Sequence, residues 1–177
     1  MPHVLINAKR CTGCHMCELA CSAFHEGTYR PSVAHLFTEV NPRTAVIKAH
    51  TCLQTGCAKC EEACPEKAIV RKQISVIPKG DFPAKAKLGE TLDGLVLVVD
   101  ESRCTGCGEC YDVCPQGVIQ PHPERKVALK CDLCDGEPQC IAFCQNSHVL
   151  AVDLKLDRAD RVLATASAHS LPHVAPQ

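Results

Sequence analysis

The sequence has very few of the aromatic residues that usually anchor a hydrophobic core. Only 3% of its 177 residues are aromatic, with no Trp, four Phe and two Tyr. In most domains of this length, large aromatic side chains supply much of the buried area. An ordinary aromatic-rich core is therefore excluded, and something else must fill the centre of the fold.

Long apolar runs are also missing. No stretch approaches the roughly 18 apolar residues that indicate a membrane-spanning helix. The first residues, MPHVLINAKRC, lack the extended apolar segment and small-residue cleavage site of a secretory signal. We therefore expect a soluble, cytoplasmic protein with no membrane span and no nucleic-acid partner.

Cysteine, by contrast, is abundant, with 16 residues. Three chemistries use cysteine at this density: disulfide frameworks, zinc sites and iron-sulfur clusters. Disulfides are rare in the cytoplasm, so the disulfide framework is the weakest of the three.

The cysteines fall into four groups of four, and none is left over. They are Cys11, Cys14, Cys17 and Cys21; Cys52, Cys57, Cys60 and Cys64; Cys104, Cys107, Cys110 and Cys114; and Cys131, Cys134, Cys140 and Cys144. Groups one and three have the CxxCxxCxxxC spacing that bacterial ferredoxins use for 4Fe-4S clusters. Group two widens the first gap, and group four widens the middle one.

Zinc is the main alternative to iron, because CxxC pairs also form zinc knuckles and ribbons. A zinc ion needs two such pairs, usually separated by a longer loop. Three thiols within seven residues suit one corner each of an iron-sulfur cube. We expect the fourth cysteine of each group to begin a short helix and to ligate a different cluster, so that the chain holds four 4Fe-4S clusters.

Such clusters would replace the missing aromatic core and supply folding free energy when they bind. They also change the charge, which is formally −1 with neutral thiols. With sixteen thiolates and four cores of roughly 2+ each, the loaded protein would carry about −9.

Short segments rich in branched aliphatic residues surround the cysteine groups. We expect strands before the four groups, at residues 4–6, 45–49, 95–100 and 126–130. Returning strands are expected after groups two to four, at 67–70, 117–120 and 149–152. The fold class is therefore predicted as α+β, a duplicated bacterial dicluster ferredoxin-like fold (polyferredoxin) with short strands and cluster-binding loops.

The predicted organisation is one four-cluster domain of two interleaved dicluster units over residues 1–152. Two insertions interrupt it: residues 22–44, expected to form an extended hairpin, and residues 78–94, expected to form an exposed loop. Residues 153–177 are expected to form a helical tail that docks on a partner.

No catalytic residue is predicted. The sequence has no GxGxxG motif, no phosphate loop and no arguable Ser-His-Asp set. A cluster held by four cysteines has no open iron site, so we expect one-electron transfer rather than substrate chemistry. The histidines, including His15, are expected to be surface or hydrogen-bonding residues because every cluster already has its cysteines.

The order of the four groups resembles the iron-sulfur subunits of molybdenum and tungsten oxidoreductases. Pro65 and Pro115 follow groups two and three, whereas Ser22 and Gln145 follow groups one and four. That resemblance implies nested pairing, in which groups one and four share two clusters and groups two and three share the others. The implied ligand sets are Cys11, Cys14, Cys17 and Cys144; Cys131, Cys134, Cys140 and Cys21; Cys52, Cys57, Cys60 and Cys114; and Cys104, Cys107, Cys110 and Cys64. Tandem pairing, one with two and three with four, stays open on spacing alone.

Within that family, CTGCHMCELACSAFHEG and CDLCDGEPQCIAFC resemble the small electron-transfer subunit of tungsten-dependent aldehyde oxidoreductases, over about residues 3–152. The resemblance implies a large catalytic subunit with a tungsten-pterin cofactor, and a ferredoxin or a flavin subunit as the second electron partner. End-to-end self-association is a further expectation.

Other functions are compatible with the same residues. The chain could be the ferredoxin-like subunit of a hydrogenase, a carbon monoxide dehydrogenase or a benzoyl-CoA reductase. It could also be a free polyferredoxin, or a zinc-bearing interaction module.

Overall fold

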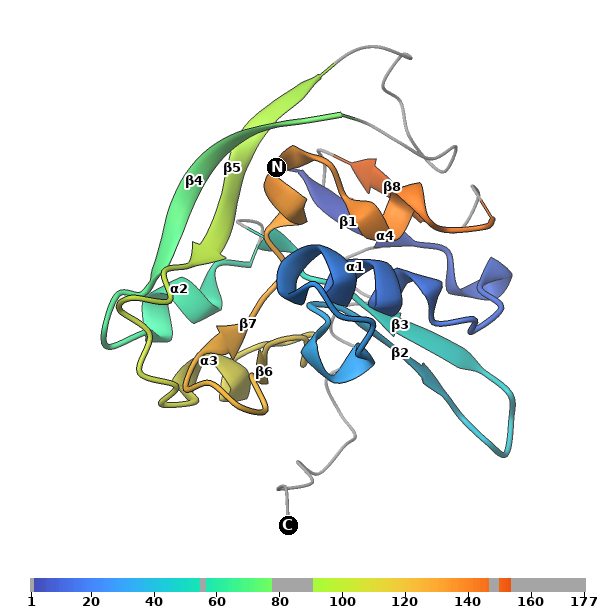
Figure 1. Ribbon diagram of the computed structural model, residues 1–177, viewed down its shortest axis with the longest axis horizontal. Coiled ribbons are helices and arrows are strands. Elements are labelled where there is room, and N and C mark those ends of the chain that lie inside the picture. The colour runs from blue at the N-terminus through green and yellow to red at the C-terminus, as the bar shows by residue number, and fades with distance from the viewer. Residues whose placement is uncertain (1, 55–56, 78–90, 147–149, 154–177) are drawn as a thin grey trace.

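The computed structural model describes residues 2–54, 57–77, 91–146 and 150–153 and is built from short helices and two-stranded antiparallel sheets (Figure 1). These residues form four sheets. β1 (His3–Ile6) pairs with β8 (Leu150–Asp153), β2 (Phe37–Val40) with β3 (Ile47–His50), β4 (Ile69–Val76) with β5 (Leu92–Val99), and β6 (Gln120–Pro121) with β7 (Ala128–Leu129). This arrangement confirms the predicted α+β, ferredoxin-like class.

Four α-helices accompany the cysteine groups, one in each. They are α1 (Met16–Glu26), α2 (Lys59–Ala63), α3 (Glu109–Asp112) and α4 (Gln139–Ala142). The described residues also form the 3-10 helices η1 (Ala8–Arg10), η2 (Pro31–Val33) and η4 (Leu133–Gly136). Most of these helices are too short to be stable alone, so their packing holds them.

The helices pack in nested order. α1 packs against α4, α2 packs against α3, and β1 from the start of the chain pairs with β8. In Figure 1, α1 and α4 lie side by side near β1 and β8, while α2 and α3 lie together at the other end. The first and last cysteine groups therefore share one half of the molecule, and the two middle groups share the other.

The long β4–β5 hairpin joins the two halves. Ile74, Val76 and Val96 belong to the core beside α1 and α4, whereas Ile69 and Leu97 belong to the core beside α2 and α3. Neighbouring residues in β5 thus face different cores, as strand alternation requires. Figure 1 shows the hairpin arching over one side of the molecule.

Strands β1, β3, β4, β5, β7 and β8 overlap the predicted segments 4–6, 45–49, 67–70, 95–100, 126–130 and 149–152. The bounds differ most for β4, which continues to Val76, and for β7, which contains only Ala128 and Leu129. The segment 117–120 becomes strand only from Gln120 onward. The expected hairpin is formed by β2, a turn at 41–46 and β3, but α1 continues to Glu26, so the hairpin begins later than residue 22.

The prediction that each fourth cysteine begins a helix is wrong. In all four groups it is the third cysteine, Cys17, Cys60, Cys110 or Cys140, that is the second residue of the helix. The fourth cysteine of groups two to four lies just after the helix, and in group one it lies inside α1. In groups two to four, the fourth sulfur is therefore carried by the chain that leaves the C-terminal end of the helix.

The predicted loop at 78–94 and the predicted tail at 153–177 fall mostly outside the described residues. β5 already begins at Leu92, so the last part of the expected loop is strand. Among the residues that the structure describes, no helix is long and apolar enough to cross a membrane.

Gly136 allows η4 to approach β4 closely, and its replacement should be costly. Its φ is +109°, and a Cβ there would lie 2.3 Å from the backbone oxygen of Ser75. Gly117, with φ +60° and open space around it, is the matched control for the backbone effect alone. We expect Gly117→Ala to cost about 1–2 kcal/mol and Gly136→Ala at least about 2 kcal/mol more, because backbone must move. Thermal unfolding of the loaded protein by circular dichroism measures both, and equal shifts would contradict this packing.

Candidate metal centres

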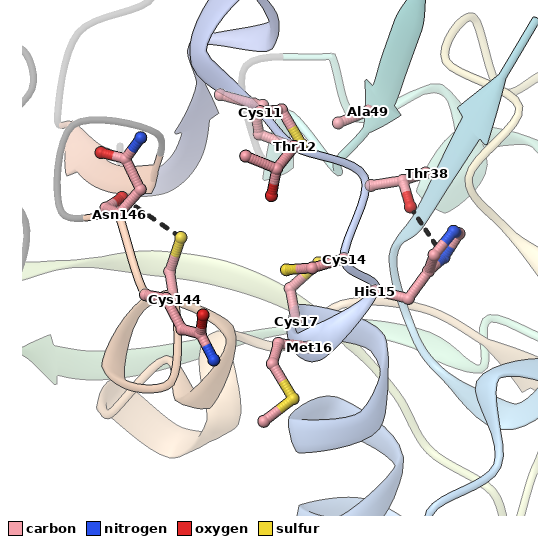
Figure 2. Close-up of a pocket in the computed structure, with 12 residues that line it drawn as sticks. Cys11, Thr12, Cys14, His15, Met16, Cys17, Thr38, Ala49, Cys144 and Asn146 are labelled. Atoms are coloured by element: carbon pink, nitrogen blue, oxygen red, sulfur yellow. Dashed lines mark hydrogen bonds between the residues drawn. The ribbon is translucent and has the colours of Figure 1, made fainter.

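The first site is a cavity of about 260 Å³ whose lining includes Cys11, Cys14, Cys17 and Cys144. Three of these cysteines come from group one, and the fourth comes from group four, more than 120 residues later in the sequence. Figure 2 shows Cys144 across the cavity from Cys14 and Cys17. The Sγ of Cys144 donates to the backbone oxygen of Asn146 at 3.2 Å. The meeting of α1 and α4 thus brings four thiols around one hollow.

Two further cavities repeat this composition in the other half. One is lined by Cys104, Cys107 and Cys110 of group three and Cys64 of group two. The other is lined by Cys52, Cys57 and Cys60 of group two and Cys114 of group three.

The remaining cysteines, Cys21, Cys131, Cys134 and Cys140, lie in the core between α1 and α4. Cys21 and Cys140 are buried in it, and Cys131 packs against it. Cys134 lies 3.7 Å from Nε2 of His25, and Cys21 has its sulfur within 4.8 Å of ligand atoms of His25 and His35. The three hollows thus bring together twelve of the sixteen predicted cysteines, in three sets of four.

A left-handed residue comes directly before the helix in the first three groups and turns the chain between the second and third cysteines. His15 has φ +59°, Ala58 +53° and Gly108 +94°, and each is the N-cap residue. The helix that follows starts one residue before the third cysteine. This turn presents the first three sulfurs on one side of the loop and explains why the helix begins at the third cysteine rather than the fourth.

Backbone N–H groups point at several sulfurs. Gly13 N donates to Cys11 Sγ at 3.5 Å, and Gln54 N donates to Cys52 Sγ at 3.3 Å. Ala68 N donates to Cys64 Sγ at 3.3 Å. Such hydrogen bonds favour negative charge on sulfur and are one of the means by which a protein adjusts cluster potentials.

Burial acts in the opposite direction on the free thiols. Burial raises the pKa of Cys17, Cys60 and Cys110 to about 12. The pKa values of Cys131 and Cys140 are also raised well above normal by burial. Metal ligation requires thiolates. These cysteines therefore stay protonated in the metal-free protein and release their protons when a metal ion binds.

His25 joins the region around Cys134 to Asp132. Its Nε2 lies 3.3 Å from Oδ1 of Asp132, and its ring stacks on His35 with centroids 4.0 Å apart. Burial alone would lower the pKa of His25, but hydrogen bonds to Asp132 and Cys134 raise it to about 12. Burial and the nearby His25 lower the pKa of His35 to about 3. The hydrogen bonds to Asp132 and Cys134 therefore favour the protonated form of His25, whereas burial and His25 disfavour it in His35.

A buried carboxylate supports the first site. Glu18 is 4% exposed, and its Oε1 accepts hydrogen bonds from Thr38 N at 2.6 Å and Thr38 Oγ1 at 2.7 Å. The same oxygen lies 2.9 Å from Nδ1 of His15, the residue between Cys14 and Met16. Glu18 therefore ties the cysteine loop to strand β2.

The donor sets fit 4Fe-4S clusters better than they fit other metals. Three separate hollows each offer four sulfurs and are lined mainly by apolar side chains and backbone. Structural zinc also accepts four cysteines. The two hollows of the half formed by groups two and three, however, exchange their fourth cysteines, Cys64 and Cys114, as the clusters of two-cluster ferredoxins do. When bound, such clusters accept and release single electrons.

No sequence pattern marks Glu18, Gln54, His25 or Lys130 as part of the centres, although all four lie beside cysteines in the structure. Charged residues next to a motif are usually exposed. Here tertiary contacts bury two charged residues, Glu18 and Lys130, which are 4% and 2% exposed. A charged residue directly beside a ligand cysteine is the one signal that could have suggested them.

Replacing Glu18 should loosen the first site. Glu18→Ala leaves the partly buried N–H of Thr38 without its acceptor, which costs about 1–3 kcal/mol, while the Thr38 hydroxyl keeps Nδ1 of His15 at 3.0 Å. Glu61 is the matched control because it also follows the third cysteine of its group, but it forms an exposed pair with Arg71. We expect Glu61→Ala to cost less than about 1 kcal/mol. Thermal unfolding of the loaded variants tests this, and equal losses would show that Glu18 has no special role.

Comparison with known proteins agrees with the donor chemistry. Two family models, each described as a 4Fe-4S binding domain, match residues 97–120 and residues 8–27. The first covers group three, and the second covers group one. Both matches lie on the predicted CxxCxxCxxxC motifs.

Two relatives match nearly the whole chain. The chain is 31% identical over 145 residues to the aliphatic sulfonate oxidoreductase, polyferredoxin-like subunit, of Pyrococcus furiosus, covering 81% of this chain and 72% of that protein. It is 30% identical over 179 residues to the electron transport protein HydN of Escherichia coli, covering 85% of this chain and 87% of that protein.

Among solved structures, the active site complex BamBC of benzoyl-coenzyme A reductase contains a chain that is 21% identical, with a TM-score of 0.44 and coverage of 94% of this chain and 88% of that one. The identity and coverage of the two sequence relatives, together with the two domain matches, decide the family. The chain belongs to the family of polyferredoxin-like 4Fe-4S electron-transfer proteins.

Proposed function

We propose that this chain holds four 4Fe-4S clusters in a row and relays electrons between a catalytic oxidoreductase subunit and a second redox partner. One observation carries the proposal: three cavities are each lined by three cysteines of one group and the last cysteine of another. All three combinations are those of nested pairing. The fourth cluster would take the remaining cysteines, Cys21, Cys131, Cys134 and Cys140.

Contacts between the sites support a linear order. The sites in the half formed by groups one and four share one core, and those in the half formed by groups two and three share the other. Cys131 packs against both cores, and the closeness of Cys52 contributes to its raised pKa. The sites of Cys131 and Cys52 would therefore be the inner pair, with the sites of Cys14 and Cys107 at the two ends.

Exposure of the cysteines agrees with this order. Cys14 and Cys107 are exposed, whereas Cys52, Cys60, Cys134 and Cys140 of the inner sites are buried. Electron transfer between proteins requires close approach of the two redox groups, so the exposed ends are where partners would dock. Burial of the inner sites keeps water and other molecules away from the clusters that would pass the electrons on.

We propose a tungsten-pterin aldehyde oxidoreductase subunit as the catalytic partner, and a ferredoxin or a flavin subunit as the other. The motifs of groups one and four support this choice. The relative in Pyrococcus furiosus, named a subunit of an aliphatic sulfonate oxidoreductase, supports the coarser role of an oxidoreductase subunit. HydN, named an electron transport protein, supports the electron-transfer role without naming a partner. A hydrogenase, a carbon monoxide dehydrogenase or a benzoyl-CoA reductase is the second candidate.

Metal analysis of the native assembly tests the partner. When it is purified without air, the chain should co-purify with a larger subunit. The assembly should contain about sixteen iron atoms for each copy of this chain, together with tungsten in fixed proportion. Iron with nickel or molybdenum would reject the aldehyde oxidoreductase and favour the second candidate. Iron in a chain that purifies alone would indicate a free carrier, and zinc without iron would contradict the electron-transfer function.

Cysteine variants test the nested pairing. Under nested pairing, Cys11→Ser and Cys144→Ser should alter the same electron paramagnetic resonance signal, because both side chains hold one cluster. Cys64→Ser is the matched control, since it is also a fourth cysteine but should alter a different signal. If Cys11→Ser and Cys64→Ser instead alter the same signal, the pairing is tandem.

A further inference from the structure

Lys130 is a buried cation at the junction between the two halves of the molecule. It is 2% exposed, and it directly precedes Cys131, which packs against both cores. Its Nζ donates to Leu97 O at 2.6 Å, to Cys131 O at 3.0 Å and to Gln54 Oε1 at 3.1 Å. Three acceptors use all three N–H groups of an ammonium, so the geometry is that of a charged lysine.

Gln54 holds this ammonium in place. It is 1% exposed, and its Oε1 also accepts from Leu97 N at 3.1 Å, while its Nε2 donates to Cys131 O at 2.7 Å. The side chain thus connects group two, strand β5 and group four. Every acceptor around Lys130 is a neutral oxygen, and no carboxylate in the described part of the chain forms an ion pair with it.

A buried charge without a counter-ion is costly. The groups that can supply negative charge here are the cysteine sites on either side. Burial raises the pKa of Cys60 to about 12, and the positive charge of Lys130 is the strongest influence opposing it. Four thiolates around a core of roughly 2+ leave a net negative charge on each loaded site.

We infer that Lys130 is the internal counter-ion of the two inner clusters and raises their reduction potentials. The inference rests on the proposed assignment of the inner sites to Cys21, Cys131, Cys134 and Cys140 and to Cys52, Cys57, Cys60 and Cys114. Reduction adds one negative charge to a cluster, and a fixed cation nearby stabilises the reduced form. Lys130 therefore keeps the middle of the row accessible to electrons that enter at either end.

The test is a redox titration of the air-free, iron-loaded protein, followed by electron paramagnetic resonance. Inner-cluster signals are assigned as those altered by Cys52→Ser and Cys140→Ser. In Lys130→Met, we expect the equilibrium constant for reduction of at least one inner cluster to fall about tenfold, as for loss of one nearby charge inside a protein. This corresponds to a reduction potential lower by about 59 mV for one electron. Lys59→Met is the matched control, because Lys59 is exposed and directly precedes Cys60, and it should leave the potentials unchanged.

A second variant separates charge from packing. Gln54→Glu keeps Lys130 in place but provides it with a carboxylate partner, so it should weaken reduction of the same cluster. Inner potentials that stay at the wild-type value in Gln54→Glu, or in a fully iron-loaded Lys130→Met, would overturn the inference. Failure of the proposed function looks different, because the wild-type protein would then lack the inner-cluster signals altogether.

Discussion

The fold depends on cysteines that are far apart in the sequence meeting around shared hollows. Cys144 reaches the cavity of Cys11, Cys14 and Cys17 only because α4 packs on α1 and β8 pairs with β1. The chain has few aromatic residues to drive this closure. Sulfur ligation supplies the missing free energy, because metal binding to a site absent from the unfolded chain is folding energy.

The same constraint explains the two cores and the hairpin between them. Each half needs two cysteine groups. The chain first completes the half that contains groups two and three, and then returns with group four to complete the half that contains group one. The β4–β5 hairpin contributes Val96 to one core and Leu97 to the other. Mutations in this hairpin would therefore disturb both halves, unlike mutations in β6 or β7.

Buried charges of opposite sign lie beside different sites. A buried anion, Glu18, lies beside the site at one end, and a buried cation, Lys130, lies at the junction of the inner sites. Charges near a cluster shift its potential in opposite directions according to their sign. The sites in the row therefore have unequal electrostatic surroundings.

Much of the fold follows from local patterns in the sequence. Cysteine spacing predicts the cluster loops, and short branched segments predict β1, β3, β5 and β8, because both signals depend only on neighbouring residues. The predicted helix starts were wrong because a residue in the left-handed conformation, such as His15, ends the loop before the third cysteine. A non-glycine residue rarely adopts this conformation, so the sequence does not predict it.

The surroundings of the sites were less predictable. The burial of Lys130 and Gln54 depends on contacts with Leu97 and Cys131, which come from other parts of the chain. A lysine before a cysteine is usually exposed. Pairing of the cysteine groups is likewise a property of the tertiary structure, so nested pairing came only from the family resemblance, and spacing alone did not exclude tandem pairing.

The most direct measurement is a crystal structure of the iron-loaded protein with an anomalous difference map at the iron absorption edge. The account predicts four iron positions in one row, each enclosed by three cysteines of one group and one of its nested partner. It also predicts that the two inner positions lie on either side of Lys130. Four iron positions enclosed in tandem pairs, or fewer positions with one inner hollow filled only by side chains, would contradict it.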